Sequence, residues 1–146
     1  MSPELLDPDQ FGSKIGRPTE ESDCYALGMT IFEVLSGQVP FQDYSYFAVM
    51  RKVLEGERPG RPEGGEGVWF TDDLWEMLGL CWSHQPGDRP TIEDVLECLE
   101  QGFTTWQPLP PDLGNGIEAG ANDNTVTFCV FSYFILNITL TINHPL

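Results

Sequence analysis

Basic residues are the scarcest charged class in this chain of 146 residues. It contains 7 Lys and Arg against 23 Asp and Glu, which gives a formal net charge of −16. Proteins that bind nucleic acids need Lys and Arg to displace counterions from phosphate groups. The composition therefore argues against nucleic acid as a partner. The acidic excess also favours solubility, but it does not determine a fold.

Cysteine and histidine are also sparse, and their spacing fits no metal site. The cysteines at positions 24, 81, 98 and 129 form no Cys-x-x-Cys pair, and neither histidine stands at zinc-ligand spacing. The chain does not resemble a small disulfide scaffold. Met1 is followed by no basic stretch and no apolar run, so no signal peptide is recognised. We expect reduced, mostly buried thiols in a cytoplasmic protein.

Charge disappears along the chain, which predicts three segments. Residues 1–102 carry 20 of the 23 acidic residues and all 7 basic ones, as a folded domain would. Residues 103–125 are rich in Pro, Gly and Asn and are predicted to be a linker. No charged residue follows Asp123, and residues 126–146 form an apolar tail.

The apolar tail has three interpretations that stay open. Residues 126–142 contain ten apolar side chains over 17 residues, at the short end for a membrane anchor. β-branched and aromatic residues dominate it, which favours an irregular or β-prone segment that packs on a surface. The third interpretation is an unselected sequence read beyond the natural frame or splice site.

The domain itself is predicted to be mainly α. Residues 25–35 are almost all apolar, which predicts a helix buried on all sides. Residues 19–23 supply capping oxygens and acidic charge at its start, and Gly37 is placed to end it. The side chains assigned to the core of this helix are Leu27, Ile31, Phe32 and Leu35.

Three amphipathic helices follow. Apolar residues recur at i, i+3, i+4 and i+7 from Tyr46 to Val53, from Leu74 to Cys81 and from Ile92 to Leu99. Thr91 with an acidic residue three positions later approximates a capping box at the start of the last helix. Residues 57–65 are rich in Pro and Gly and are predicted to form a loop.

Three short motifs stand in fixed order along this domain. They are Ser2-Pro3-Glu4, then Ser22-Asp23-Cys24-Tyr25-Ala26-Leu27-Gly28, then Cys81-Trp82 with Pro86-Gly87-Asp88-Arg89-Pro90. In this order, residues 2–100 resemble the lower half of a eukaryotic protein kinase domain, closest to the tyrosine-kinase-like group. The resemblance implies a helical C-terminal lobe, in which a central buried helix is surrounded by smaller ones.

The resemblance assigns a structural ion pair to Glu4 and Arg89. Glu4 matches the glutamate of the Ala-Pro-Glu motif, with Ser2 in place of alanine, and Arg89 matches the arginine near the end of the domain. A guanidinium can hold a carboxylate by two parallel hydrogen bonds. Spacing alone leaves two unrelated surface charges as the alternative. Trp82 is assigned to the core.

Two further assignments come from the same resemblance. Asp23 matches the aspartate at the start of the central helix, which anchors the catalytic loop in kinases; the alternative is an ordinary acid at a helix N-terminus. Ser2 and Pro3 correspond to the end of the loop that contacts a peptide substrate.

The motifs that carry phosphoryl transfer do not occur in this sequence. Transfer requires a Gly-rich loop over the phosphates, a His-Arg-Asp motif and an Asp-Phe-Gly motif. The chain contains none of them, so we assign no catalytic, cofactor-binding or metal residue. ATP and magnesium are expected only for a full-length parent. We predict a kinase fragment that is inactive as written and self-associates through exposed apolar surface. The resemblance implies a protein substrate or partner that binds through the helical lobe. The alternative is therefore a non-catalytic interaction module, tethered to a membrane if the tail inserts.

Overall fold

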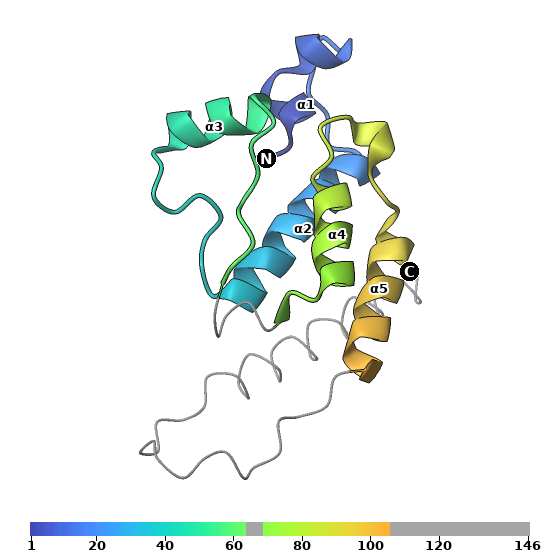
Figure 1. Ribbon diagram of the computed structural model, residues 1–146. Coiled ribbons are helices and arrows are strands. Elements are labelled where there is room, and N and C mark those ends of the chain that lie inside the picture. The colour runs from blue at the N-terminus through green and yellow to red at the C-terminus, as the bar shows by residue number, and fades with distance from the viewer. Residues whose placement is uncertain (64–68, 106–146) are drawn as a thin grey trace, which may run out of the picture.

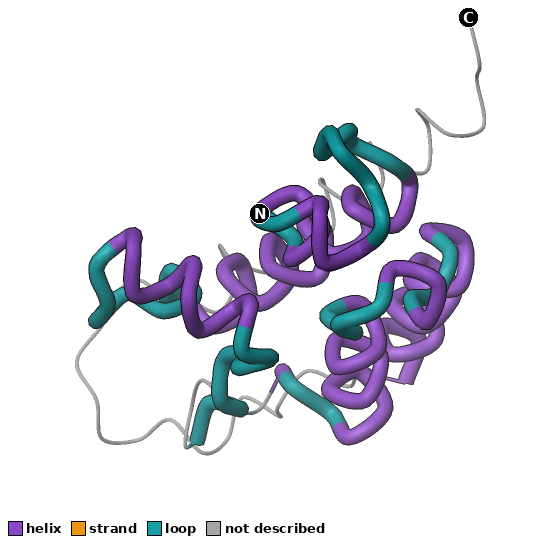
Figure 2. The backbone as a smooth tube through the Cα atoms, turned by 90° about the horizontal axis from the view of Figure 1, so that it is seen from above, coloured by secondary structure: helices purple, strands orange, loops and turns teal. Residues whose placement is uncertain are grey.

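The computed structural model describes residues 1–63 and 69–105, and every regular element within these ranges is helical (Figure 2). The expectation of a mainly α fold is therefore confirmed for the described residues. The predicted tail and most of the predicted linker lie outside them. The elements are α1 (Pro3–Leu6), η1 (Pro8–Phe11), α2 (Glu20–Ser36), α3 (Tyr46–Leu54), α4 (Asp72–Cys81), η3 (Pro86–Asp88) and α5 (Ile92–Thr105).

Helix α2 runs through the middle of the molecule (Figure 1). The α4 and α5 helices lie side by side along one flank of α2, and α3 lies on the other flank (Figure 1). The short elements α1 and η1 cover the end of the molecule at which α2 begins (Figure 1). This arrangement places the first residues of the chain close to η3, more than eighty positions later.

The two ends of α2 are fixed by local hydrogen bonds. Thr19 Oγ1 accepts a bond from the Ser22 backbone N–H at 3.3 Å, and Ser22 Oγ accepts one from the Thr19 N–H at 2.9 Å. These reciprocal bonds form a capping box and satisfy N–H groups that lack a partner within the helix. At the other end Gly37 has φ of 68°, a left-handed conformation that costs glycine little. The predicted start and end of this helix are confirmed.

Burial of α2 differs from the prediction in one respect. Ile31, Phe32 and Leu35 are buried, but the predicted core residue Leu27 is only half-buried. Glu33 and two small residues of the same helix are exposed. Within the described ranges, α4 and η3 pack against one side of α2 and leave another side open. Although the sequence of α2 is mostly apolar, the helix is therefore buried mainly along the side that α4 and η3 cover.

The crossing of α2 with the end of α4 depends on Gly28. A Cβ atom at this position would lie 2.7 Å from Trp82 Nε1 and 2.8 Å from the Cβ of Cys81. Glycine therefore allows the two chain segments to approach closely. Trp82, only 2% exposed, fills the core beside this contact, as predicted, and packs edge-on against Phe32 and Trp75.

Helix α5 begins with the predicted capping box. The Thr91 backbone N–H donates to Asp94 Oδ2 at 3.0 Å, and the Asp94 N–H donates to Thr91 Oγ1 at 3.2 Å. The helix continues to Thr105, so residues 103–105 are helical although composition places them in the linker. In the part of the chain that the structure describes, no helix is both long enough and apolar enough to cross a membrane.

Candidate functional site

Among the described residues, the charged contact of longest sequence separation joins Glu4 of α1 to Arg89. Arg89 Nη1 donates to Glu4 Oε1 at 2.8 Å, and Nη2 donates to Glu4 Oε2 at 2.7 Å. The Arg89 side chain is 0% exposed and that of Glu4 is 11% exposed. Both oxygens of the carboxylate are thus held by both terminal nitrogens of the guanidinium, the arrangement that lysine cannot provide.

Arg89 also binds two backbone carbonyl groups from other segments. Its Nε donates to the Ser83 carbonyl at 3.0 Å, in the loop between α4 and η3. Its Nη1 donates to the Glu21 carbonyl at 2.8 Å, in the first turn of α2. One buried side chain therefore fastens α1, the start of α2 and the end of α4 to one another. We call Arg89, Glu4 and the carbonyl groups of Ser83 and Glu21 the arginine clasp.

Local sequence directs Arg89 into this position. Pro86 begins the short turn η3, whose backbone bonds are Asp88 N–H to the Gln85 carbonyl and Arg89 N–H to the Pro86 carbonyl. Proline follows Arg89, and a residue before proline is driven to extended backbone. Arg89 has φ of −83° and ψ of 145° and so leaves the turn extended.

The clasp lowers the pKa of the Glu4 carboxyl below its usual value. Burial by itself acts to raise this pKa, because it disfavours the charged form. The hydrogen bonds from Arg89 and nearby groups, with the charge of Arg89, outweigh burial and favour the carboxylate. Glu4 is therefore ionised at neutral pH.

The Tyr25 ring lies close to two guanidinium groups, one of them in the clasp. The guanidinium carbon of Arg89 lies 5.0 Å from the centre of the Tyr25 ring, and that of Arg58 lies 5.4 Å from it. Both distances are within the range of cation–π attraction. The ring is fully buried, and burial raises the pKa of the Tyr25 hydroxyl. The phenol therefore stays neutral and acts as packing for the two arginines.

Arg58 is the structural residue that the sequence analysis missed. Its Nε donates to the Trp82 carbonyl at 2.7 Å, and its Nη1 donates to the Val53 carbonyl at 3.1 Å. It thus ties the end of α3 to the end of α4. The sequence places it in a Pro- and Gly-rich loop, and its partner carbonyl is 24 positions away. The one feature of the sequence that could have indicated a structural role for Arg58 is the proline that follows it, because Arg89 is also followed by proline.

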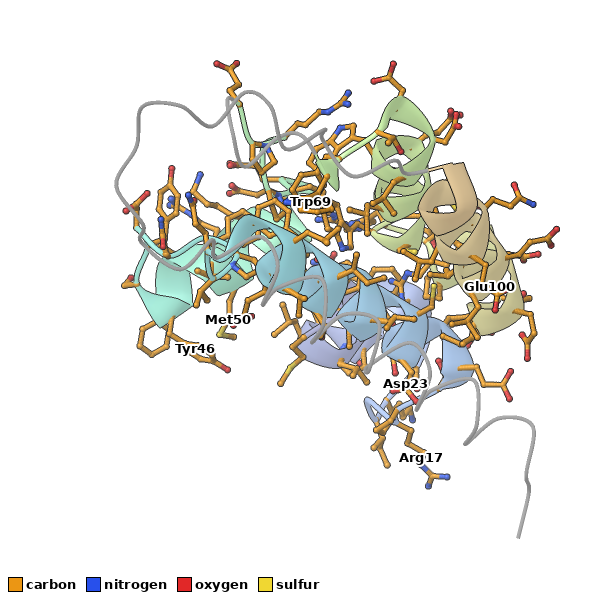
Figure 3. All side chains as sticks on the ribbon, turned by 90° about the horizontal axis from the view of Figure 1, so that it is seen from below. Arg17, Asp23, Tyr46, Met50, Trp69 and Glu100 are labelled. Atoms are coloured by element: carbon orange, nitrogen blue, oxygen red, sulfur yellow. The ribbon has the colours of Figure 1, made fainter. Side chains whose placement is uncertain are left out.

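The remaining predicted site residues occupy different surroundings. Ser2 and Pro3 are buried at the start of α1, while Met1 beside them is 69% exposed. Asp23 is exposed on the first turn of α2, at the end of the molecule where Arg17 also lies (Figure 3). The structure brings Glu4 and Arg89 together, and it leaves Asp23 outside their hydrogen-bonded network.

The arginine clasp holds chain segments together, and two buried thiols lie in the same core. Cys24 and Cys81 are free and buried, and Cys98 is free and half-buried; the fourth cysteine lies outside the described residues. A mutual contact between Cys24 and Cys81, with burial, raises the pKa of Cys81, so this thiol stays protonated. Among residues 1–63 and 69–105, no three His, Cys, Asp or Glu residues are grouped to hold a metal ion.

Comparison with known proteins identifies the family of this chain. A family model described as protein tyrosine and serine/threonine kinase matches residues 1–99. This chain belongs to that protein kinase family. The family match ends within α5 and includes every residue of the arginine clasp.

Kinases of several organisms are similar to this chain. It is 29% identical over 97 residues to the serine/threonine-protein kinase mos of Patiria pectinifera, covering 66% of this chain and 26% of that protein. It is 33% identical over 102 residues to the probable serine/threonine-protein kinase gdt4 of Dictyostelium discoideum, covering 69% of this chain and 6% of that protein. The tyrosine-protein kinase receptor ver-3 of Caenorhabditis elegans is 29% identical over 83 residues, which cover 56% of this chain and 6% of the receptor. The match thus spans between 6% and 26% of these relatives.

Proposed function

We propose that this chain supplies the helical lower lobe of a protein kinase and does not transfer phosphate by itself. In a complete kinase domain this lobe supports transfer of a phosphoryl group from ATP, with magnesium, to a hydroxyl group of a protein. The observation that carries the proposal is the buried, two-bond contact between Glu4 and Arg89. Its role is to hold the first residues of the chain against the start of α2.

Inactivity of the chain alone follows from what phosphoryl transfer requires. Catalysis depends on positioned groups that bind phosphates and magnesium and that orient the attacking hydroxyl. The printed sequence has no Gly-rich phosphate loop, no His-Arg-Asp and no Asp-Phe-Gly. The described residues supply a scaffold and no substitute for these groups.

A domain exchange tests both parts of the proposal. Residues 1–99 replace the matched segment of the Patiria pectinifera kinase mos. We expect the chimera to phosphorylate a generic protein substrate, and we expect Arg89→Met to abolish that activity. Residues 1–146 alone should neither bind ATP nor transfer phosphate. Phosphate transfer by the isolated chain, or a folded but inactive chimera, would overturn the proposal.

A second candidate function is a non-catalytic interaction module, favoured by the surface of α3. Tyr46 is 66% exposed and Phe47 is 81% exposed, and both lie at the start of that helix. Figure 3 shows Tyr46 on the outer side of the molecule. Next to it an apolar hollow of about 250 Å³ is lined by Leu6, Met29 and Val49 among others. Exposed aromatic side chains beside such a hollow are typical of protein-binding surfaces.

Competition distinguishes this second function from simple inactivity. The purified chain is added to a full-length relative, such as mos, while that kinase phosphorylates a protein substrate. An interaction module inhibits the reaction by occupying the substrate, and the double substitution Tyr46→Ser with Phe47→Ser removes the inhibition. Absence of inhibition at a large excess of the chain removes this candidate.

A further inference from the structure

The α4 and α5 helices carry acidic side chains and no basic ones. Three acidic residues lie in Asp72–Cys81 and four in Ile92–Thr105, while neither range contains Lys, Arg or His. Figure 3 shows many oxygen-tipped side chains around these helices, including the labelled Glu100 of α5. Because like charges repel, a surface of this kind is stabilised by a cationic partner.

Four of these carboxylates line one groove between the two helices. The groove has a volume of about 570 Å³ and is lined by Asp73 and Glu76 of α4 and by Asp94 and Glu97 of α5. Asp94 accepts a hydrogen bond from the Thr91 hydroxyl at the start of α5, and Glu97 accepts one from the side-chain amide of Gln101 in the same helix. Asp73 and Glu76 form no ion pair with any residue in the described ranges.

The floor of the same groove is apolar. Leu74 and Met77 are half-buried and pack against the core, and Leu80 is 44% exposed. Cys98 of α5 lies opposite them, where burial first and then the charge of Asp73 raise the pKa of its thiol. The charge of an α4 carboxylate thus reaches a thiol on α5. We call the apolar floor of the groove, formed by Leu74, Met77 and Leu80, the trough. We call the carboxylates of α4 and α5 that line the groove its rims.

The spacing of the lining residues shows how the groove runs. On α4 they fall at positions 73, 74, 76, 77 and 80, and on α5 at positions 94, 97, 98, 101 and 102, so each set follows one helical face. An apolar groove along two neighbouring helices accepts the apolar side of a third helix. Its volume is also within the about 300–1,000 Å³ of clefts that hold apolar groups.

We propose that the groove between α4 and α5 binds a cationic amphipathic helix of a partner protein. The apolar side chains of that helix lie on Leu74, Met77 and Leu80, and its Lys or Arg side chains face Asp73, Glu76 and Glu97. A divalent cation is disfavoured, because no three potential ligands among the described residues are grouped around one point. Nucleic acid is disfavoured by repulsion from the carboxylates. The site is separate from the arginine clasp and does not depend on phosphate transfer.

Binding of a model peptide to residues 1–146 tests this assignment. The probe is a fluorescent helix of Leu and Lys, with Leu at i, i+3, i+4 and i+7. A scrambled peptide of equal composition controls for charge alone, and a Glu-for-Lys version controls for apolar contact alone. Fluorescence anisotropy should show that the amphipathic cationic peptide binds about tenfold more tightly than either control, because both the trough and its rims contribute.

Matched variants locate the binding site. Asp73→Asn, Glu76→Gln and Glu97→Gln together remove three charges from the groove. The control variant, Asp9→Asn with Glu33→Gln and Asp43→Asn, removes three exposed charges elsewhere. Because each rim contact contributes modestly, we expect the groove variant to bind about tenfold more weakly and the control variant to bind within about twofold of the parent chain.

A second measurement does not depend on substitution of the rim. A chloroacetyl group at the centre of the peptide should alkylate Cys98 faster than the same group on the scrambled peptide, as measured by mass spectrometry of the digested protein. Equal weakening by the groove and control variants, equal binding of the scrambled peptide, or no binding to the full chain would overturn the proposal. So would a dimer that only the groove variant dissociates, because a second copy would then occupy the groove.

Discussion

The ion pairs on the two flanks of α2 differ in their burial and in the segments that they join. On the flank of α4 and η3, one arginine with 0% exposure binds three distant segments. On the flank of α3, the pair between Arg51 and Glu55 lies in solvent, with side chains that are 72% and 55% exposed. Buried charges have no water to replace a lost partner, whereas exposed charges do. The clasp therefore couples chain segments, and the surface pairs of α3 do not.

This contrast also separates the stable part of the molecule from the part suited to recognition. Arg89 of the clasp lies against Tyr25, which is fully buried, whereas α3 presents Phe47 with 81% of its surface exposed. Few buried contacts lower the free energy of local opening. We therefore expect α3 to exchange its backbone protons before the clasp region does.

Loss of the clasp arginine should have the largest effect. Arg89→Met leaves the Glu4 carboxylate buried without its partner, which costs about 3–5 kcal/mol in the free energy of unfolding. Urea unfolding of the full chain, followed by circular dichroism, measures this change. Arg51→Met is the matched control, and its cost should stay within about 0.5 kcal/mol because Arg51 is exposed. Similar losses in the two variants would contradict the difference between the flanks.

Crowding of the helix crossing should have the next largest effect. Gly28→Ala places a methyl group within 2.8 Å of both Trp82 and Cys81, which should cost about 1–3 kcal/mol of stability. Gly79→Ala in α4 meets no atom within 4 Å and should stabilise the chain by up to about 1 kcal/mol, since alanine favours helix. Thermal unfolding compares the two. A stabilising Gly28→Ala would show that α2 and α4 do not cross as closely as described.

The clasp should also make stability depend on pH in a defined direction. The pKa of Glu4 is lowered in the folded chain from a value near 4.5, so the folded state favours the carboxylate. The resulting stability is fully present above pH 4.5 and is lost as the pH falls through the lower folded pKa. The stability difference between the parent chain and Glu4→Gln should therefore shrink with acidification. A difference that stays constant from about pH 6 downward would exclude an ionised Glu4 as its source.

The smallest effect on stability should come from the surface of α3. Phe47→Ser removes a side chain that is 81% exposed, so the free energy of unfolding should change by less than about 0.5 kcal/mol. Self-association should nevertheless weaken, because exposed apolar surface drives association. Sedimentation velocity at several concentrations measures this. An unchanged association constant would place the association surface elsewhere.

The helices were predictable because their determinants are local. The i, i+3, i+4 spacing predicted α3, α4 and α5, and the capping pairs beside α2 and α5 formed where their residues stand within three positions of each other. The pair of Glu4 and Arg89 was predicted from the family resemblance and not from spacing. The elements η1 and η3 were not predicted, since three or four residues carry no periodicity.

The sequence by itself determined where α2, α3, α4 and α5 lie, how α2 and α5 begin and to which family the chain belongs. The tertiary structure alone decided that Leu27 is half-buried and that the guanidinium groups of Arg58 and Arg89 lie close to the Tyr25 ring. It alone also revealed the acidic, apolar-floored groove between α4 and α5. Capping and periodicity depend on neighbours within about four residues along the chain. Burial and charge pairing depend instead on which distant segments pack together, over separations as large as 85 positions.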